Sequence, residues 1–172
     1  MVKKPAKPII EDVINDTLSG DTLNNALNFI AYLRENKISP QWSATNAWKI
    51  SYKTYTVCFI RLHGAAEYHN LDAGSWHILP FIGEYGDDTL PDEFKEIVWA
   101  NHRKCKTCGG CSLKLDRVFG KAFVNSCEGS IVLKNPDERT VECAKRLIEL
   151  RRQEIKDGMA KKHTYVAIRN RV

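Results

Sequence analysis

Near its middle the chain reads Ala47-Trp48-Lys49-Ile50-Ser51-Tyr52-Lys53-Thr54-Tyr55-Thr56-Val57-Cys58-Phe59-Ile60-Arg61-Leu62. Trp48, Ile50 and Tyr52 alternate with polar neighbours, which is typical of a strand with one buried face. After a break at Lys53-Thr54, the residues are apolar on both faces, which suits a central strand covered on both sides. We therefore expect an antiparallel hairpin over 47–63 at the centre of the protein.

Around this hairpin, strand patterns and helix patterns are intermixed, with short connections. The fold we expect is α+β, with an antiparallel sheet packed against two or three helices, plus a cysteine-rich loop. The helices expected are a short one over 9–18, one N-capped by Asp21 that runs to about residue 35, one opened by Pro91, and a long one starting at 135–138. Further strands are expected over 75–82, 118–124 and 130–133, and a loop over 36–46.

The length of 172 residues suits one domain with a real core. We expect a disordered tail over 1–8, a single α+β domain over 9–157 that contains the cysteine loop 105–127, and a C-terminal tail or edge strand over 158–172. No apolar run approaches the roughly 20 residues of a membrane span, and no apolar segment follows the basic start as in a signal peptide. These features predict a cytoplasmic protein in a reducing compartment and no membrane partner.

The net charge of +5 belongs to the ends of the chain. Residues 1–8 hold three Lys and no acid, and residues 145–172 hold nine Lys or Arg against three acids, whereas the body between them is net negative. Inside the body, basic residues gather around the cysteines, where they would offset the formal charge of a four-thiolate zinc site. This interpretation is favoured over a nucleic-acid partner, although the basic termini leave that alternative open.

Three cysteines at even spacing, Cys105, Cys108 and Cys111, lie in one polar segment, with a fourth at Cys127. Clustered thiols hold a metal or carry out redox chemistry. Gly109-Gly110 would let the segment curl around a single ion, because glycine reaches positive φ at little steric cost. The pattern predicts a structural zinc site held by these four cysteines.

Alternatives to this site stay open. His102 continues the spacing and competes with Cys127 as fourth ligand, although it also suits the end of the preceding helix. The ferredoxin spacing would need a cysteine at Leu115, but an iron–sulfur cluster with a distant fourth ligand remains an alternative cofactor, as do thiols with no cofactor.

Aromatic residues gather around the proposed sheet. Trp48, Tyr52 and Trp76 are candidates for a pocket that binds an apolar or aromatic small molecule, and a simple aromatic core is the competing interpretation. His63, His69 and His77 match no usual zinc spacing and are interpreted as ordinary histidines.

The chain has no phosphate-binding glycine loop, no nucleophile elbow and no zinc-protease motif. This lowers the expectation of an enzyme. The function predicted is a non-enzymatic binding domain with a structural zinc site, and the alternatives are a redox or iron–sulfur protein and a nucleic-acid binder.

Several segments also resemble a known group of proteins. Trp48 to Lys53 with Val57-Cys58, Cys105 to Cys111, Gly120 to Phe123 with Cys127, and Asn135-Pro136-Asp137 are similar to an uncharacterised bacterial family found mainly in clostridia, and more loosely to YdhG-like small domains. The resemblance covers about two thirds of the chain. It implies the α+β fold and the cysteine pattern, and it mildly favours small-molecule binding.

Overall fold

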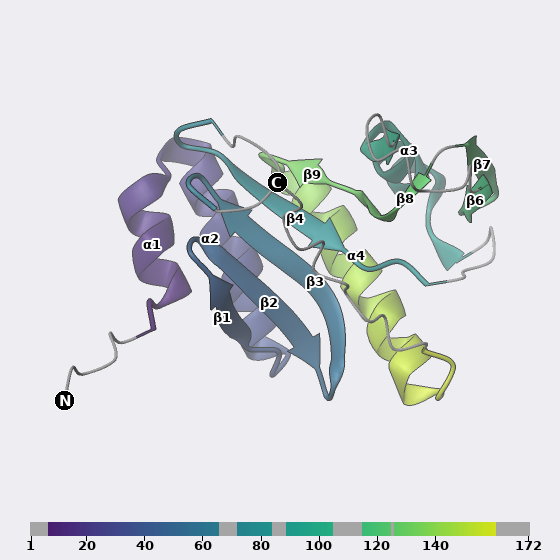
Figure 1. Ribbon diagram of the computed structural model, residues 1–172, viewed down its shortest axis with the longest axis horizontal. Helices are drawn as coiled ribbons and strands as arrows, with labels where there is room; N and C mark the ends of the chain where they lie inside the picture. The colour runs from purple at the N-terminus through teal and green to yellow at the C-terminus, as the bar shows by residue number, and fades with distance from the viewer. Residues whose placement is uncertain (1–6, 66–71, 84–88, 105–114, 125, 161–172) are drawn as a thin grey trace, which may run out of the picture.

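The computed structural model describes residues 7–65, 72–83, 89–104, 115–124 and 126–160 (Figure 1). The class of fold is α+β, as predicted. The helices described are α1 (Ile10–Thr17), α2 (Gly20–Glu35), α3 (Asp92–Ala100) and α4 (Glu138–Lys156). The strands are β1 (Pro40–Ala44), β2 (Ala47–Tyr52), β3 (Tyr55–Leu62), β4 (Trp76–Pro80), β5 (His102–Lys104), β6 (Leu115–Val118), β7 (Lys121–Val124), β8 (Ser126–Ile131) and β9 (Leu133–Lys134).

The main sheet has the strand order β1-β2-β3-β4-β9, and each neighbouring pair is antiparallel. The predicted hairpin is β2–β3, and β3 occupies the centre of the sheet as its sequence indicates. The turn at Lys53 has a φ of 53°, an uncommon value for a residue with a side chain. The most apolar strand thus has a hydrogen-bonded neighbour on each edge.

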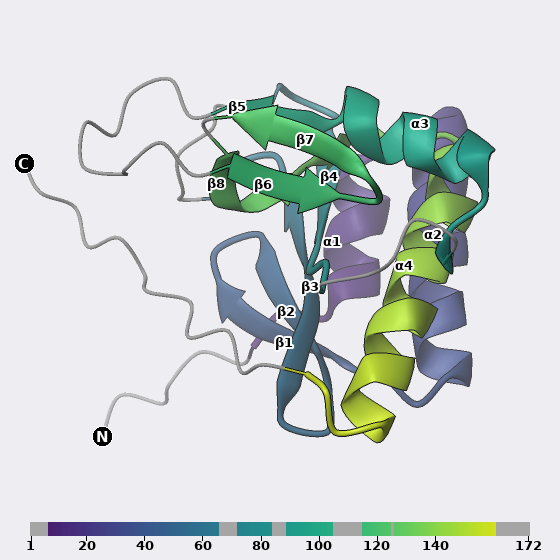
Figure 2. The same cartoon turned by 90° about the vertical axis from the view of Figure 1, so that its right-hand side faces the viewer.

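The helices that pack on the sheet lie on one face of it. α2 and α4 lie behind the sheet in Figure 1, and the turned view of Figure 2 has α1, α2 and α4 on the same side of β1, β2 and β3. Phe29 of α2 contacts Trp76 of β4, with ring centroids 6.2 Å apart. The residues of the sheet that point to this side are buried and belong to one core cluster with the helices: Trp48, Ile50, Cys58, Ile60, Leu62, Trp76, Ile78 and Leu133.

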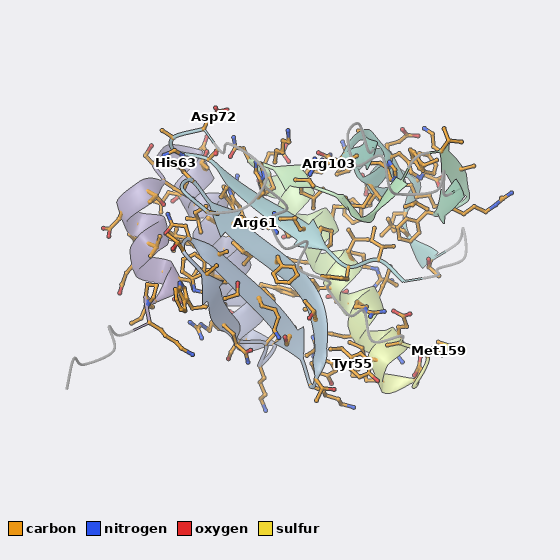
Figure 3. The ribbon with its side chains drawn as sticks, in the orientation of Figure 1. Tyr55, Arg61, His63, Asp72, Arg103 and Met159 are labelled. Carbon is orange, nitrogen blue, oxygen red and sulfur yellow. The ribbon has the colours of Figure 1, made fainter. Side chains whose placement is uncertain are left out.

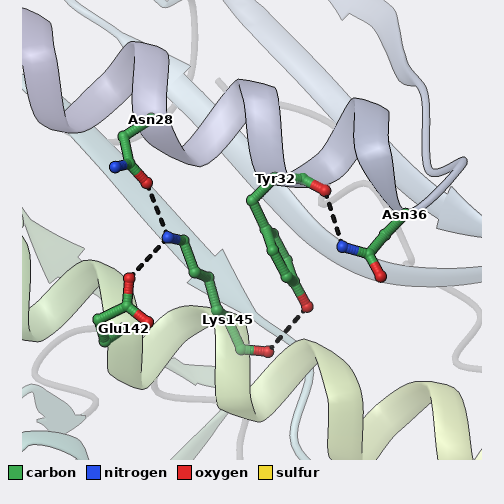
Figure 4. Close-up of polar contacts among 5 residues, drawn as sticks. All are labelled: Asn28, Tyr32, Asn36, Glu142 and Lys145. Atoms are coloured by element: carbon green, nitrogen blue, oxygen red, sulfur yellow. Dashed lines mark hydrogen bonds and ion pairs between the residues drawn. The ribbon is translucent and has the colours of Figure 1, made fainter.

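Polar contacts join α2 to α4 above this core (Figure 4). The Tyr32 hydroxyl donates to the backbone oxygen of Lys145 at 3.3 Å. Lys145 Nζ donates in turn to Asn28 at 2.7 Å and to Glu142 at 2.6 Å. Burial, aided by the negative charge of Glu149, raises the pKa of Tyr32 to about 12.

The segment before α4 ties this helix to β4. Asn135 has a positive φ of 41°; its side chain accepts from Trp76 N and its own N–H donates to Trp76 O, both at 2.9 Å. Asp137 then caps α4 by accepting from the backbone N–H of Thr140 at 2.8 Å. Hydrogen bonds from the Thr140 side chain and from its backbone N–H hold the pKa of Asp137 below its usual value. The predicted start of the last helix is confirmed.

The far end of α4 carries a buried ion pair. Arg151 is 1% exposed and is paired with Glu154 one turn further along. The chain that leaves β4 passes so close that a Cβ on Gly83 would lie 2.5 Å from the Glu154 carboxylate oxygens. Glycine at residue 83 therefore lets the backbone approach this ion pair.

Three local predictions were wrong. The expected loop over 36–46 contains β1, an edge strand that begins at Pro40, where proline costs no ladder hydrogen bond. The expected strand over 118–124 is a hairpin, because Phe119 and Gly120 turn the chain with φ of 45° and 82°. The N-cap position of α2 is Ser19 rather than Asp21, and the Ser19 side chain makes no capping hydrogen bond.

The two strand pairs β5–β8 and β6–β7, together with α3, form a small layer beside the main sheet (Figure 2). Trp99 of α3 donates from its indole nitrogen to Val118 O at 2.8 Å, which attaches the β6–β7 hairpin to the helix. Of the helices described, none is both long enough and apolar enough to cross a bilayer.

Candidate functional site

The cysteines predicted to bind zinc fall at the edge of the described structure. Cys105, Cys108 and Cys111 lie outside the described residues, and Cys127 lies in β8. Within the described ranges, no three His, Cys, Asp or Glu side chains gather closely enough to hold a metal ion. A metal site formed by the predicted cysteines would therefore draw on residues outside these ranges.

The backbone on both sides of the cysteine segment is described. β5 pairs with β8 in antiparallel register, with Lys104 opposite Ser126. Cys105 follows Lys104 in the sequence, and Cys127 follows Ser126. Because consecutive Cα atoms are about 3.8 Å apart, the first and the last cysteine of the set are each one residue away from the same cross-strand pair.

His102 is the competing fourth ligand. It lies in β5 opposite Ile131. Its ring stacks on Phe123, with centroids 3.9 Å apart and an angle of 17° between the planes. The aromatic contact accounts for the position of this imidazole, and the choice between His102 and Cys127 stays a prediction.

The two cysteines outside the cluster are core residues. Cys58 on β3 and Cys143 on α4 are both 0% exposed. The Cys143 thiol is within hydrogen-bond range of Phe94 O, at 3.7 Å. Burial raises the pKa of Cys58, and it raises the pKa of Cys143 to about 12. Both thiols are therefore protonated and unreactive at neutral pH.

The three aromatic residues predicted to bind a ligand do not share one surface. Trp48 and Trp76 are 1% and 0% exposed and contribute to the core between sheet and helices. Tyr52 is partly buried, and the Arg152 guanidinium lies over its ring at 5.0 Å. Arg152 also borders a shallow hollow of about 270 Å³ along α4. The ligand-binding role of the three aromatic residues stays a prediction.

The opposite face of the main sheet carries basic side chains that are far apart in the sequence. Along each strand, residues that face the helices alternate with residues that face away from them. The residues that face away include Lys49, Arg61, His77 and Lys134. Arg61 lies opposite His77, and His77 lies opposite Lys134, so these three form one row across β3, β4 and β9. We call Lys49, Arg61, His77 and Lys134 the cationic face; Figure 3 labels Arg61 over the sheet, in the view that has α2 and α4 behind it.

Burial within the cationic face is uneven. Arg61 is 7% exposed and His77 is 8% exposed, whereas Lys134 is exposed. Phe59, in the neighbouring row, is half-buried and contacts Phe81, with ring centroids 5.8 Å apart. Charged and aromatic side chains thus lie next to each other on this face. These side chains come together across paired strands and not along the chain. Only a prediction of the strand register would have found this face from the sequence.

The chain matches no protein-family model, no curated protein and no solved structure. The resemblance to the clostridial family and to YdhG-like domains stays a prediction.

Proposed function

We propose that this protein is a non-enzymatic cytoplasmic binding domain whose small layer is held in place by a structural zinc ion. The zinc ligands are Cys105, Cys108, Cys111 and Cys127. The ligand of the domain is a small molecule, and the main sheet with its helices is the rigid support for that binding.

The register of β5 and β8 carries the zinc proposal. Lys104 and Ser126 are opposite each other, so chain connectivity keeps the Cα atoms of Cys105 and Cys127 each within about 3.8 Å of this pair, although the antiparallel strands leave the pair in opposite directions. Tetrahedral zinc needs its four sulfurs at about 2.3 Å from the metal. The segment 105–111 would have to curl back toward Cys127 to bring Cys105, Cys108 and Cys111 to the same ion, and Gly109-Gly110 would make such a path easy.

The position of this site explains why the domain would need a metal. The strands beside it are short, since β5 has three residues and the β6–β7 hairpin has strands of four. Isolated two-stranded pairs of this length are marginally stable in water. Zinc bound by thiolates from both ends of the segment would supply folding free energy to this layer.

The test is a competition titration with a chromophoric zinc chelator. Cys127→Ser should weaken zinc binding by at least about tenfold, since a thiolate ligand is lost, while His102→Gln should leave the affinity unchanged. If His102→Gln weakened zinc binding and Cys127→Ser did not, His102 rather than Cys127 would be the fourth ligand. Equal and weak zinc binding by both variants and by the unchanged protein would overturn the zinc proposal.

A further inference from the structure

The basic residues of α4 fall into two groups. Four of them form ion pairs with acids: Arg139 with Glu93, Lys145 with Glu142, Arg146 with Glu149, and Arg151 with Glu154. The other two, Arg152 and Lys156, form no ion pair with the residues that the structure describes. Both of them line the shallow hollow of about 270 Å³ along α4. The hollow therefore carries the two positive charges of this helix that the described acids do not pair.

Arg152 is a half-buried cation held by neutral groups. Its Nη1 donates to Asn36 Oδ1 at 2.7 Å, and its guanidinium lies over the Tyr52 ring at 5.0 Å. Tyr32, at the seam of α2 and α4 in Figure 4, is also within reach of Arg152 and keeps its proton at neutral pH, because burial raises its pKa to about 12. These contacts fix the guanidinium in place but supply no opposite charge, which a cation taken partly out of water requires.

Arg152 also keeps a donor that the described residues do not use. Its Nε–H is buried and has no acceptor among them, and a buried donor without an acceptor lowers stability. The Nε and Nη2 hydrogens of an arginine lie along one edge of the guanidinium and match two oxygens of a phosphate or carboxylate. A small rotation of this side chain would present that edge to an oxyanion in the hollow.

Lys156 adds a second charge at the same place. It follows Arg152 by four residues, so the two side chains are one turn apart on the same side of α4. Side chains at this spacing have Cβ atoms about 5–6 Å apart, and like charges there repel each other. Lys156 is exposed, so its ammonium can move toward a ligand. A single anion between the two cations would offset both charges, and a dianion would do so better than a monoanion.

The other residues that line the hollow limit the ligand in charge and size. Of the described residues that line it, Glu149 is the only acid, and its carboxylate is paired with Arg146 at 3.1 Å. Leu150 is half-buried and packs against the core, so it offers an apolar surface beside the cations. Pockets for drug-sized ligands begin at about 300 Å³, so this hollow suits a smaller molecule.

We propose that the hollow along α4 binds a small organic phosphate, with its phosphate at Arg152 and Lys156 and its apolar part against Leu150. This rests on the proposed small-molecule binding and names the class of ligand and its place. The arginine fork orients the phosphate, the lysine adds charge, and the apolar contact adds affinity that an inorganic ion would lack.

The experiment is an NMR titration of the full chain at about pH 7.5, where a phosphate monoester carries nearly two negative charges. The probe is phenyl phosphate. Inorganic phosphate carries the charge without the ring, benzoate carries the ring with one charge, and benzyl alcohol carries the ring without charge. We expect phenyl phosphate to bind most tightly, with the largest backbone amide shifts over 149–156 and at Asn36. Equal binding of any reference compound would overturn the proposal. Shifts confined to other parts of the chain would overturn this site and leave small-molecule binding standing.

Variants locate the site. Arg152→Gln should weaken phenyl phosphate binding at least about tenfold, as expected for loss of hydrogen bonds to a charged group. Lys156→Gln, on an exposed side chain, leaves the packing of α4 intact and should weaken binding about twofold to fivefold. Glu149→Gln should strengthen it by a similar factor, because an acid is removed from the hollow.

The matched control is Arg139→Gln, which removes an exposed cation at the other end of the same helix and should have no effect. Weakening equal to that of Lys156→Gln, or unchanged binding by both Arg152→Gln and Lys156→Gln, would overturn the proposal. Zinc content, measured on the same samples, separates this proposal from the zinc site, because a chain that holds zinc but binds no probe contradicts only the phosphate site.

Discussion

Removal of zinc should change the reactivity of four cysteines and leave two unchanged. The perturbation is a strong chelator added to native protein at about pH 8, followed by a thiol reagent. Only the thiolate reacts, so the rate depends on pKa and on exposure. The four cysteines of the proposed site should be protected by zinc and react after chelation, whereas Cys58 and Cys143 should stay unmodified in both conditions.

The size of the difference follows from burial. An ordinary thiol with a pKa of about 8.5 is roughly one quarter ionised at pH 8. Cys143, with a pKa of about 12, is ionised to only about one part in ten thousand. The thiolate fraction alone thus separates the two classes by roughly a thousandfold, and the complete burial of Cys58 and Cys143 slows them further.

The assay is alkylation by iodoacetamide at timed intervals, with each site assigned by peptide mass spectrometry. Guanidinium-unfolded protein is the control, in which all six cysteines should react at similar rates. The reasoning would be refuted if Cys58 or Cys143 reacted as fast as the cluster in native protein. Equal rates at the four cluster cysteines with and without the chelator would refute the zinc site.

Three further predictions concern stability. In urea titrations, Asp137→Ala should lower the free energy of unfolding by about 1 kcal/mol through loss of the α4 cap, and Asp137→Asn, which can still cap, should lower it by much less. Because the pKa of Asp137 is lowered in the folded state, the stability it contributes is present above the pKa of the unfolded state. This contribution should fade as the pH falls through the pKa of the folded state. In Gly83→Ala the new Cβ would meet the Glu154 carboxylate, which is the end of a flexible side chain and can shift. The loss of stability should therefore stay at the lower end of the range for overpacking, about 1 kcal/mol, from the disturbed pair with Arg151, and a loss of several kcal/mol in thermal unfolding would contradict this reasoning. The unfolded chain releases the Tyr32 proton near pH 10 and the folded chain near pH 12, so the free energy of unfolding should fall as the pH rises from 10 to 12. Tyr32→Phe should flatten the plot of this free energy against pH over that range. A plot identical to that of the unchanged protein would count against the raised pKa.

Much of the fold could be predicted because the local signals agree with the tertiary structure. The alternation at Trp48, Ile50 and Tyr52 and the apolar run over 55–62 predicted the central hairpin, and Asp137 marked the start of α4. β1 was missed because its strand conformation comes from pairing with β2, and Pro40 alone indicated a loop. The β6–β7 turn was missed because Phe119, a bulky residue, adopts a positive φ that its sequence does not favour.

The arrangement of side chains on the two faces of the main sheet was harder to predict for a physical reason. A central strand that is apolar on both faces does not show which face the helices will cover. Trp48 and Trp76 were chosen as pocket residues, and the helices cover them. Arg61 and His77 are far apart in the sequence, and only the register of β3 and β4 places them side by side.

The central claim is the zinc-stabilised binding domain, and elemental analysis of the natively purified protein tests it most directly. Inductively coupled plasma mass spectrometry should find one zinc per chain, and a variant with Cys105, Cys108, Cys111 and Cys127 all changed to Ser should contain none. Iron in place of zinc, no metal, or zinc retained by the four-serine variant would contradict the account.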